Sequence, residues 1–491
     1  MSPSIRLMLV VACSLPSVAM AQGWPGRDRF EPEACSAAEP SPSAREWLER
    51  ARRATGLGTA DGVLHWRSTE VDVQFFQSDR PAPPYIESSA AREWWFDPAT
   101  GVERWQSIPA GGPVFLRSDR ASFVARDTAL TPSPPLHRFL AASRALNPLA
   151  VLFDWTDGDA RVAERCELRG YPRVVLERGG ERLYLDPKSG IPVKLERIEP
   201  HPTWGQVRAE YLYGTWWRSG AVILPVVSVR YVDGVEHLRR NVSLPQRAAD
   251  QLVETLARAD APPLAVPDAD HRDAPDFQRQ PTPVDTIRVD ANTVLLSTRL
   301  YTHAVTLQRD TVFLFDATTG EWRSRADSAL IATLFPGARA MVLVVTDLAW
   351  PHIDGVRFWV ARGATIVAHE LAKPFLTQLV ERRWTLAPDL LARQPRPLRV
   401  RTTRSGLDLA GGAVRVRPID GTASEGALMV AVPSASFLWA GDYIQTVDTP
   451  SQYAIEVVRA VEREGLAPTR TAAQHLPLTP WPAVVQANPA R

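Results

Sequence analysis

About two thirds of the way along the chain, an apolar run stops at residues whose side chains can transfer protons or ligate metals. The run "MVLVV" (Met341–Val345) is followed by "TDLAWPHIDG" (Thr346–Gly355), which contains Asp347 and His352. Carboxylates and imidazoles are the usual general acids and bases of enzymes and common ligands of zinc. A buried strand that ends in such residues places them at the edge of a sheet. The segment is therefore a candidate functional site.

Other kinds of active site lack their sequence signals. A Gly-x-Ser-x-Gly motif is absent, and the turn "GTASEG" (Gly421–Gly426) lacks the strand-to-helix elbow that a nucleophilic serine needs. A phosphate-binding glycine loop is absent as well. His303 falls inside a predicted strand and is typical of a core or edge histidine. His369 ends another predicted strand, and we interpret it as a partially exposed structural residue.

The elements that position this candidate site are strands alternating with helices. Beyond Asp285 the strand patterns include "TIRVDANTVLLST", "HAVTLQRDTVFLFDA", "MVLVVTD" and "ATIVAH". Between and after them, helical spacing predicts helices over Ser324–Leu334, Ile353–Arg362 and Lys373–Arg382. This alternation indicates an α/β fold for the second half of the chain.

The first half has a different pattern. From Val63 to Leu244 the apolar residues alternate with polar ones, which predicts antiparallel strands joined by tight turns. Two turns, "FDPATG" (Phe96–Gly101) and "LDPKSG" (Leu185–Gly190), combine an Asp cap, a Pro and a Gly, as hairpin turns do. Helices are predicted over Ala44–Ala54, Leu136–Ala145 and Gln246–Arg258.

The ends of these patterns divide the chain into five parts. We predict a signal peptide over residues 1–21, a Pro/Ser-rich lead over 22–43, an antiparallel β domain over 44–258, a Pro/Asp-rich linker over 259–285 and an α/β domain over 286–491. The signal rests on an apolar stretch that ends in the cleavage pattern Ala19-Met20-Ala21. A lipoprotein signal that would attach the chain through Cys13 is the alternative.

Length and composition limit the remaining classes. The 491 residues suffice for two or three domains, and the net charge of +1 with histidine neutral argues against a nucleic-acid partner. After the signal, every apolar stretch is too short to span a membrane, so the mature chain is predicted to have no transmembrane segment. Export predicts a periplasmic protein, with secretion or a lipid anchor as alternatives. In an oxidising periplasm Cys35 and Cys166 either pair or remain two thiols, and the sequence leaves both open.

The order of elements beyond Asp285 resembles the metallo-β-lactamase superfamily. The signature of that family is T-H-x-H-x-D-H-x-G-G at a strand end, and the corresponding stretch here is "TDLAWPHIDG". Downstream, "FLWAGDY" (Phe437–Tyr443) matches the strand that ends in Gly-Asp, and "TAAQHLPLTPW" (Thr471–Trp481) matches the terminal Gly-His turn. The resemblance implies an αββα sandwich that holds one or two metals, mostly zinc, and mostly hydrolyses esters, thioesters, lactams or phosphodiesters.

Compared residue by residue, the resemblance implies that the first metal position is lost. Asp347 and Ala349 stand where the family has its first two ligand histidines. In the stretch "IDGTASEGALMVAVP", Ala423 stands where the third is expected. Alanine has no ligand atom, so this position retains too few ligands for a metal.

The second metal position keeps more of its ligands. The resemblance assigns His352, Asp442 and His475 to it, and Pro351 replaces its carboxylate ligand. Asp347 is close enough in sequence to supply an oxygen or to act as a general base. Two histidines and one aspartate form a legitimate three-ligand zinc site with room for water. The alternative is that these residues are relics without a metal.

The first half resembles the half-barrel of periplasmic lipoprotein carriers. The stretches "LYLDPKSGIPVKLE" and "YGTWWRSGAVILPVVSVRY" give the resemblance, which covers Ala44–Leu244. It implies a curved antiparallel sheet with few helices and an apolar groove for a lipid-like ligand. A structural or substrate-presenting domain is the alternative.

Three functional hypotheses follow. The first is an exported metallo-β-lactamase-fold protein whose dinuclear site is eroded and which acts as a binding or accessory module. The second is a mononuclear metal-dependent hydrolase in which His352, Asp442 and His475 hold one zinc ion and Asp347 assists. The third is a periplasmic carrier of an apolar ligand. A small molecule or a lipid-like ligand is the expected partner.

Overall fold

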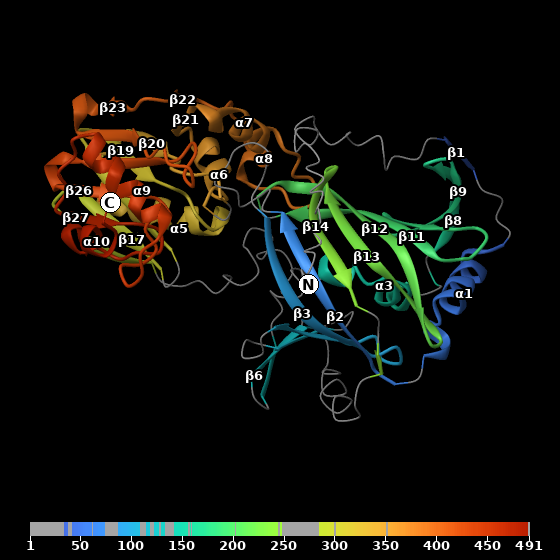
Figure 1. Ribbon diagram of the computed structural model, residues 1–491. Helices are drawn as coiled ribbons and strands as arrows, with labels where there is room; N and C mark the ends of the chain where they lie inside the picture. The colour runs from blue at the N-terminus through green and yellow to red at the C-terminus, as the bar shows by residue number, and fades with distance from the viewer. Residues whose placement is uncertain are drawn as a thin grey trace, which may run out of the picture.

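Figure 1 shows the computed structural model of the chain. It describes residues 34–37, 42–60, 62–73, 87–108, 114–117, 122–126, 129–132, 142–155, 158, 160–201, 203–243, 246–247, 284–298, 301–349 and 352–489. The predicted signal peptide, most of the predicted lead and linker, and most of two predicted helices (136–145 and 246–258) lie outside these residues. Pro351 lies outside them as well.

The N-terminal region, residues 34–247, is built on one 15-stranded antiparallel sheet. Its strands are β1 (Ala34–Ala37), β2 (Leu64–Val73), β3 (Glu87–Phe96), β4 (Glu103–Ile108), β5 (Val114–Arg117), β6 (Ser122–Arg126), β7 (Ala129–Pro132), β8 (Arg161–Leu168), β9 (Tyr171–Arg178), β10 (Glu181–Leu185), β11 (Pro192–His201), β12 (Gly205–Ser219), β13 (Val222–Val232), β14 (Val235–Val242) and β15 (Gln246–Arg247). The order is β1-β8-β9-β10-β11-β12-β13-β14-β2-β3-β4-β5-β6-β7, and β15 pairs with β2. The prediction of helix at Gln246 was wrong, because these two residues extend the sheet beside β2.

The two Asp-Pro turns have the predicted hairpin chemistry. Asp97 accepts hydrogen bonds from the backbone of Ala99 and the hydroxyl of Thr100, and Asp186 accepts them from the backbone of Lys188 and Ser189. The closing glycines have φ of 69° and 80°, which residues with a side chain rarely adopt. Each six-residue turn therefore fixes the register of the two strands that it joins.

Two helices, α1 (Ala44–Thr55) and α3 (Pro148–Asp154), pack on one face of this curved sheet (Figure 1). We call this the helix-bearing face. The prediction of α1 was confirmed: Ser43 and Glu46 form a capping box, and Trp47, Leu48 and Ala51 are buried. These side chains and the inward-facing strand residues form one hydrophobic core.

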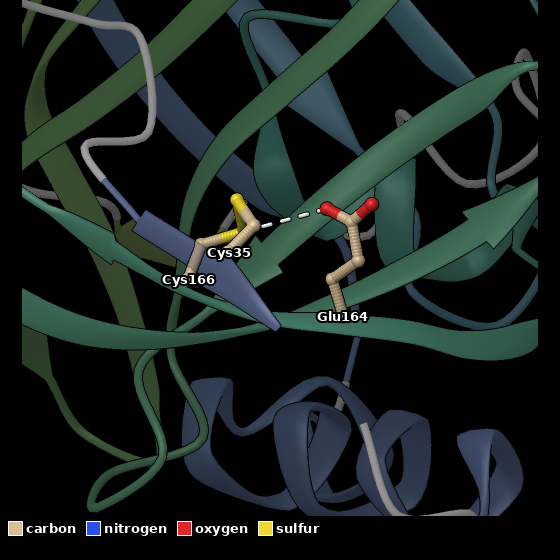
Figure 2. A group of neighbouring side chains, drawn as sticks. All are labelled: Cys35, Glu164 and Cys166. Carbon is tan, nitrogen blue, oxygen red and sulfur yellow. Dashed lines mark hydrogen bonds between the residues drawn. A yellow bond between two sulfur atoms is a disulfide. The ribbon is translucent and has the colours of Figure 1, made fainter. Parts of the chain in front are cut away.

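A disulfide joins Cys35 on β1 to Cys166 on β8, which settles the alternative that the sequence left open (Figure 2). The two residues are directly opposite each other in the β1–β8 pair. The Glu164 carboxylate lies 3.5 Å from the Cys166 sulfur. Because both sulfurs are oxidised, this group offers no thiolate to a metal.

The C-terminal region, residues 284–489, contains two smaller sheets. The seven-stranded sheet has the order β16 (Asp285–Arg288), β17 (Thr293–Ser297), β18 (Thr302–Gln308), β19 (Thr311–Phe315), β20 (Ala340–Val344), β21 (Thr365–His369) and β22 (Val400–Thr403). The six-stranded sheet has the order β23 (Leu407–Leu409), β24 (Val414–Pro418), β25 (Leu428–Val432), β26 (Phe437–Trp439), β27 (Arg470–Ala472) and β28 (Thr479–Pro480). Strands β19 to β22 are parallel, and so are β26 and β27.

Hydrophobic cores arrange this region in four layers. One core lies between the two sheets. Along β19, Phe313 and Phe315 belong to this core, whereas Val312 and Leu314 belong to the core on the outer face of the seven-stranded sheet. The outer face of the seven-stranded sheet is covered by α5 (Gly320–Leu334), α6 (Val356–Ala361), α7 (Lys373–Glu381) and α8 (Leu390–Arg393). The outer face of the six-stranded sheet is covered by α9 (Gln452–Arg463) and α10 (Trp481–Ala487). This is the helix–sheet–sheet–helix order predicted from the sequence. No described helix combines the length and apolar character needed to cross a membrane.

The turn between β11 and β12 contacts the C-terminal region. Trp204 is 3% exposed and meets the ring of Phe375 edge to face. Arg382 donates to the carbonyl oxygen of Trp204 and forms an ion pair with Asp233, with an N–O distance of 2.7 Å. The hydroxyl of Thr203 donates to Asp354, directly before α6. The two regions therefore share a packed contact surface.

Candidate metal centre

The sequence-predicted site residues all follow strands whose ends meet at one edge of the C-terminal layers. Asp347 follows β20, and His352 precedes α6. Asp442 follows β26, and His475 follows β27. Asp347 and His475 are 128 residues apart in the chain (475 − 347), and the packing of the two sheets brings the ends of their strands to one edge.

Three of these side chains converge. One ligand atom each from His352, Asp442 and His475 lies within 4.8 Å of the other two. Asp442 Oδ1 is 3.5 Å from His475 Nε2. The side chain of His475 is 35% exposed and that of Asp442 is 20% exposed, whereas His352 is buried. The cluster is therefore reachable from solvent on one side and closed on the other.

Asp347 lies behind His352 and outside this converging group. Its Oδ1 atom is 2.9 Å from His352 Nδ1 and accepts the backbone N–H of Ala349 at the same distance. This contact places a proton on Nδ1, so a metal at this residue would bind Nε2 and displace the proton that Nε2 carries when the imidazole is charged. Asp347 Oδ2 is buried and accepts no hydrogen bond within the described part of the chain. A carboxylate in this position orients a ligand histidine and increases its basicity.

A buried aspartate beneath the cluster was not identified as a site residue from the sequence. Asp316, directly after β19, accepts hydrogen bonds from the backbone and hydroxyl of Thr346, from Trp439 Nε1 and from Gln474 Nε2. It thereby joins the ends of β19, β20, β26 and β27. The acid at the strand end in "FLFDA" was the available signal.

Charges in the cluster shift the protonation of its members. Burial alone would lower the pKa of His352, but the charges of Asp347, Asp442 and Asp316 and the Asp347 hydrogen bond outweigh it and raise the pKa to about 9. Burial and the neighbouring Asp347 charge raise the pKa of Asp316 to about 6. Burial raises the pKa of Asp354 to about 7, against the hydrogen bond from Thr203. Acidic groups thus outnumber cations at this edge, an arrangement that favours a bound cation.

The positions at which the resemblance implies a first metal site make other contacts. Ala349 is buried, and its N–H is taken by Asp347. The backbone N–H of Ala423 donates to Glu456 Oε1 of α9, whose other oxygen accepts the Ser424 hydroxyl at 2.6 Å. A Cβ atom on Gly421 would lie 1.8 Å from the same carboxylate. Glu456 therefore holds the Ala423 loop against α9.

Backbone contacts hold the two ligand loops together. The N–H of Gln474 donates to the carbonyl of Gly441, and Thr302 donates to the carbonyl of Gln474. Gly441 has a φ of 60°, and a Cβ atom there would lie 2.4 Å from the Thr346 hydroxyl. The ring of Tyr301 lies 4.8 Å from that of His475 and 5.9 Å from that of His352, centre to centre. The loops that carry Asp442 and His475 are thus preorganised.

The remaining histidines of this region are structural. The interpretation of His303 as a core residue was confirmed, because it is fully buried between Asp327 and Thr318. Its Nε2 accepts the Thr318 backbone N–H, so this Thr-His-Asp arrangement is not free to activate the hydroxyl. His369 is 4% exposed, not partially exposed as predicted, and its Nδ1 accepts the N–H of Leu371.

The converging donor set fits one zinc ion. Zinc bonds of about 2.0–2.2 Å in tetrahedral geometry place ligand atoms roughly 3.4 Å apart. The Asp442–His475 distance of 3.5 Å already meets this requirement. Two imidazoles and a carboxylate leave a fourth position for water, as catalytic zinc sites do.

Comparison with solved structures finds chains that are similar to parts of this one at low sequence identity and low TM-score. DIM-1 metallo-β-lactamase is 15% identical over 42% of this chain and 96% of its own, with a TM-score of 0.32. A metallo-β-lactamase from Pontibacter korlensis is 13% identical over 41% of this chain and 95% of its own, with a TM-score of 0.32. A LolA-superfamily protein from Nitrosomonas europaea is 13% identical over 42% of this chain and 94% of its own, with a TM-score of 0.30. No protein-family model and no curated protein sequence matches the chain. At these values the likeness assigns no activity.

The described part of the helix-bearing face of the N-terminal sheet has little space for the ligand that a carrier would hold. Side chains of α1 and α3 fill the space against the strands. A cavity bordered by Trp66, Leu146, Ser228 and Arg240 has a volume of about 10 Å³, enough for roughly one water molecule. A lipid-like ligand stays a prediction.

Proposed function

We propose that this is an exported metallo-β-lactamase-like protein that retains one metal position and has lost the other, and that acts as a metal-containing binding or accessory module. The convergence of His352, Asp442 and His475 carries the proposal. Zinc is the expected ion, because two imidazoles and one carboxylate match its ligand preferences. One zinc ion without its partner lacks the two-metal clamp that stabilises both attacking and leaving oxygens.

The supporting residues have defined roles in this proposal. His352 Nε2, Asp442 and His475 Nε2 hold the ion. Asp347 fixes the His352 ring through Nδ1, and Asp316 fixes the strand ends beneath it. A bound zinc ion supplies Lewis acidity and lowers the pKa of a coordinated water.

Metal analysis of the purified protein tests the proposal. We expect one zinc per chain in the wild type and less than about a tenth of that in Asp442→Ala and His475→Ala, because two-ligand sites bind zinc weakly. His369→Asn is the matched control, since His369 is a strand-end histidine outside the cluster and Asn preserves its capping role. Absence of zinc from the wild type under zinc-replete conditions would establish the relic alternative.

A mononuclear hydrolase is the second candidate, favoured by the exposure of His475 and Asp442, which lets a substrate reach the site. Asp347 Oδ2, a buried acceptor without a hydrogen bond in the described chain, is the candidate general base behind His352. Its test is zinc-dependent cleavage of an ester, a thioester and a β-lactam substrate. Activity abolished in both Asp442→Ala and Asp347→Asn would support it, and wild-type rates equal to buffer would exclude it for these substrates.

We also propose a periplasmic location, with secretion or attachment through Cys13 as alternatives. The Cys35–Cys166 disulfide supports this location, because such bonds persist in oxidising compartments. Fractionation with detection of the mature N-terminus distinguishes the three: cleavage after Ala21 supports a free periplasmic or secreted chain, and lipid on Cys13 supports an anchored one.

A further inference from the structure

An arginine on the helix-bearing face of the N-terminal sheet is buried without a hydrogen-bond acceptor in the part of the chain that the structure describes. Arg117 ends β5 and is 8% exposed. Its Nε and Nη1 atoms are buried and donate to no acceptor in the described chain. Burying an unpaired guanidinium costs several kcal/mol, so such groups are nearly always paired. Arg117 therefore requires an explanation.

The acid directly across from Arg117 is already committed. Glu103 is opposite Arg117 in the β4–β5 pair, so both side chains lie on the same face. Glu103 Oε1 accepts Asn147 Nδ2 at 2.8 Å, and Oε2 accepts Arg144 Nη1 at 3.3 Å. Asp154, the other nearby acid, accepts two hydrogen bonds from Arg144. Both carboxylates serve Arg144, and Arg117 is left as the surplus cation.

Two arginines and two acids surround Arg117, and both acids accept hydrogen bonds from Arg144. Burial and the charge of Arg144 lower its pKa to about 9, and Arg197 acts in the same direction, while Glu103 and Asp154 oppose them. An oxyanion beside Arg117 would remove this penalty, and a guanidinium with two free N–H groups presents the fork geometry that carboxylates and phosphates match. The missing group is therefore an anion.

Aromatic rings adjoin the guanidinium on the same face. Phe115, two residues before Arg117 on β5, is half-buried and stacks on Trp105 with ring centres 4.2 Å apart. Trp105 in turn lies 5.7 Å from Trp94, centre to centre. Trp94 and Trp105 are buried in the core, so a ligand that meets Arg117 with its charge can place an apolar or aromatic body against the half-buried Phe115 ring.

We propose that Arg117 is the anchor of a binding site for a small oxyanion, a carboxylate or a phosphate ester, carried on an aromatic or apolar body. The site belongs to the N-terminal region and does not depend on the proposed metal position. The Arg144–Glu103 and Arg144–Asp154 pairs keep these acids away from Arg117 and so preserve it for the ligand.

Calorimetric titration of the full-length mature protein tests the proposal. The probes are phenyl phosphate, benzoate, inorganic phosphate and the uncharged benzyl alcohol. We expect one of the two aromatic anions to bind at least about tenfold more tightly than benzyl alcohol and than inorganic phosphate. In Arg117→Met that affinity should fall by about 10- to 100-fold, the range for loss of a charge-assisted hydrogen-bonded pair. Stronger binding of phenyl phosphate assigns a phosphate ligand, and stronger binding of benzoate assigns a carboxylate.

Two further variants keep the outcome decisive. Arg161→Met, which removes an exposed arginine of β8, should leave every affinity unchanged. Arg117→Met should melt no lower than the wild type without ligand, because it removes an unpaired buried charge, and it should lose the rise in Tm that the anion gives the wild type. Lack of anion binding to the wild type, or equal binding to Arg117→Met, would overturn the proposal, and tight inorganic phosphate would overturn the role of the rings.

Discussion

In the C-terminal region, buried acidic side chains outnumber buried cations. On the helix-bearing face of the N-terminal sheet, the surplus buried charge is the guanidinium of Arg117. Asp316, Asp347 and Asp354 are each at most 8% exposed, and one buried imidazole, that of His352, lies near them. Arg117 has the same degree of burial and the opposite charge. Folding places both sets where water cannot solvate them, so each selects a ligand of opposite sign. Unbalanced buried charge therefore marks candidate sites that sequence motifs alone do not reveal.

Among the buried acidic residues, replacement of Asp316 should lower the stability of the protein most. Replacing it by alanine leaves buried donors of Thr346, Trp439 and Gln474 without an acceptor. We expect the free energy of unfolding to fall by about 3–5 kcal/mol, measured by urea denaturation. Asp310→Ala, at an exposed turn before β19, should change it by less than about 0.5 kcal/mol. A loss below about 1 kcal/mol for Asp316→Ala would contradict this role.

The cationic side is tested at Glu103. Glu103→Gln removes a negative charge that Arg144 contacts and increases the positive surplus around Arg117. The expected loss is about 2–3 kcal/mol in the same denaturation assay. In an Arg117→Met background the loss should be about 1 kcal/mol smaller, because one like-charged neighbour is gone. An equal loss in both backgrounds would show that Glu103 and Arg117 are not coupled.

The contact between the regions is expected to weaken at acid pH. Burial and the charge of Arg230 lower the pKa of His201 to about 3 from 6.5, and its Nδ1 accepts the N–H groups of Thr203 and Trp204. Below pH 6.5 the unfolded chain binds the proton and the folded chain does not, so stability is lost as the pH falls from 6.5 towards 3. We expect His201 to contribute about 3 kcal/mol of this loss between pH 6.5 and pH 4.

His201→Asn is the variant that isolates this contribution. Thermal melts of both proteins between pH 7 and pH 4 should show a shallower decline for the variant, because asparagine has no titrating group. Parallel declines would assign the acid sensitivity to other groups.

The smallest expected effect is a change in zinc affinity at Asp347. It distinguishes a residue that orients His352 from a residue that binds the metal. Asp347→Asn keeps the shape of the side chain but removes the charge beside His352 Nδ1, and zinc affinity should fall by about tenfold in competition with a chelator. Asp408→Asn, an exposed aspartate on β23, should have no effect. A loss comparable to that of Asp442→Ala would place Asp347 among the ligands.

Local signals in the sequence predicted much of the architecture. The amphipathic helix over Ala44–Ala54, the turns at Asp97 and Asp186 and the period-two strands all depend on neighbours within a few residues, which is why the sequence predicted them. Helix starts were less accurate: α5 begins at Gly320 and α6 at Val356, against predicted starts at 324 and 353. Directly before α6, the N–H of Gly355 donates to the carbonyl oxygen of Ala317, a long-range contact that no local pattern encodes.

The parts that sequence could not predict depend on long-range pairing. The contacts of Asp316 with Trp439 and Gln474 span 123 and 158 residues, and no local pattern encodes them. Glu456 holds the Ala423 loop from a different helix in the same way. Arg117 received no prediction, because an arginine at the end of a strand normally lies in solvent.

The disulfide of β1 has a consequence for association between molecules. β1 is four residues long, exposed, and the outermost strand of its sheet beside the eight-residue β8. A long uncovered strand presents a row of backbone donors and acceptors that another chain can pair with. The covalent bond between Cys35 and Cys166 keeps a short blocking strand on that row. Under reducing conditions we expect β1 to separate more easily from β8 and to leave the edge of β8 open to pairing with another chain.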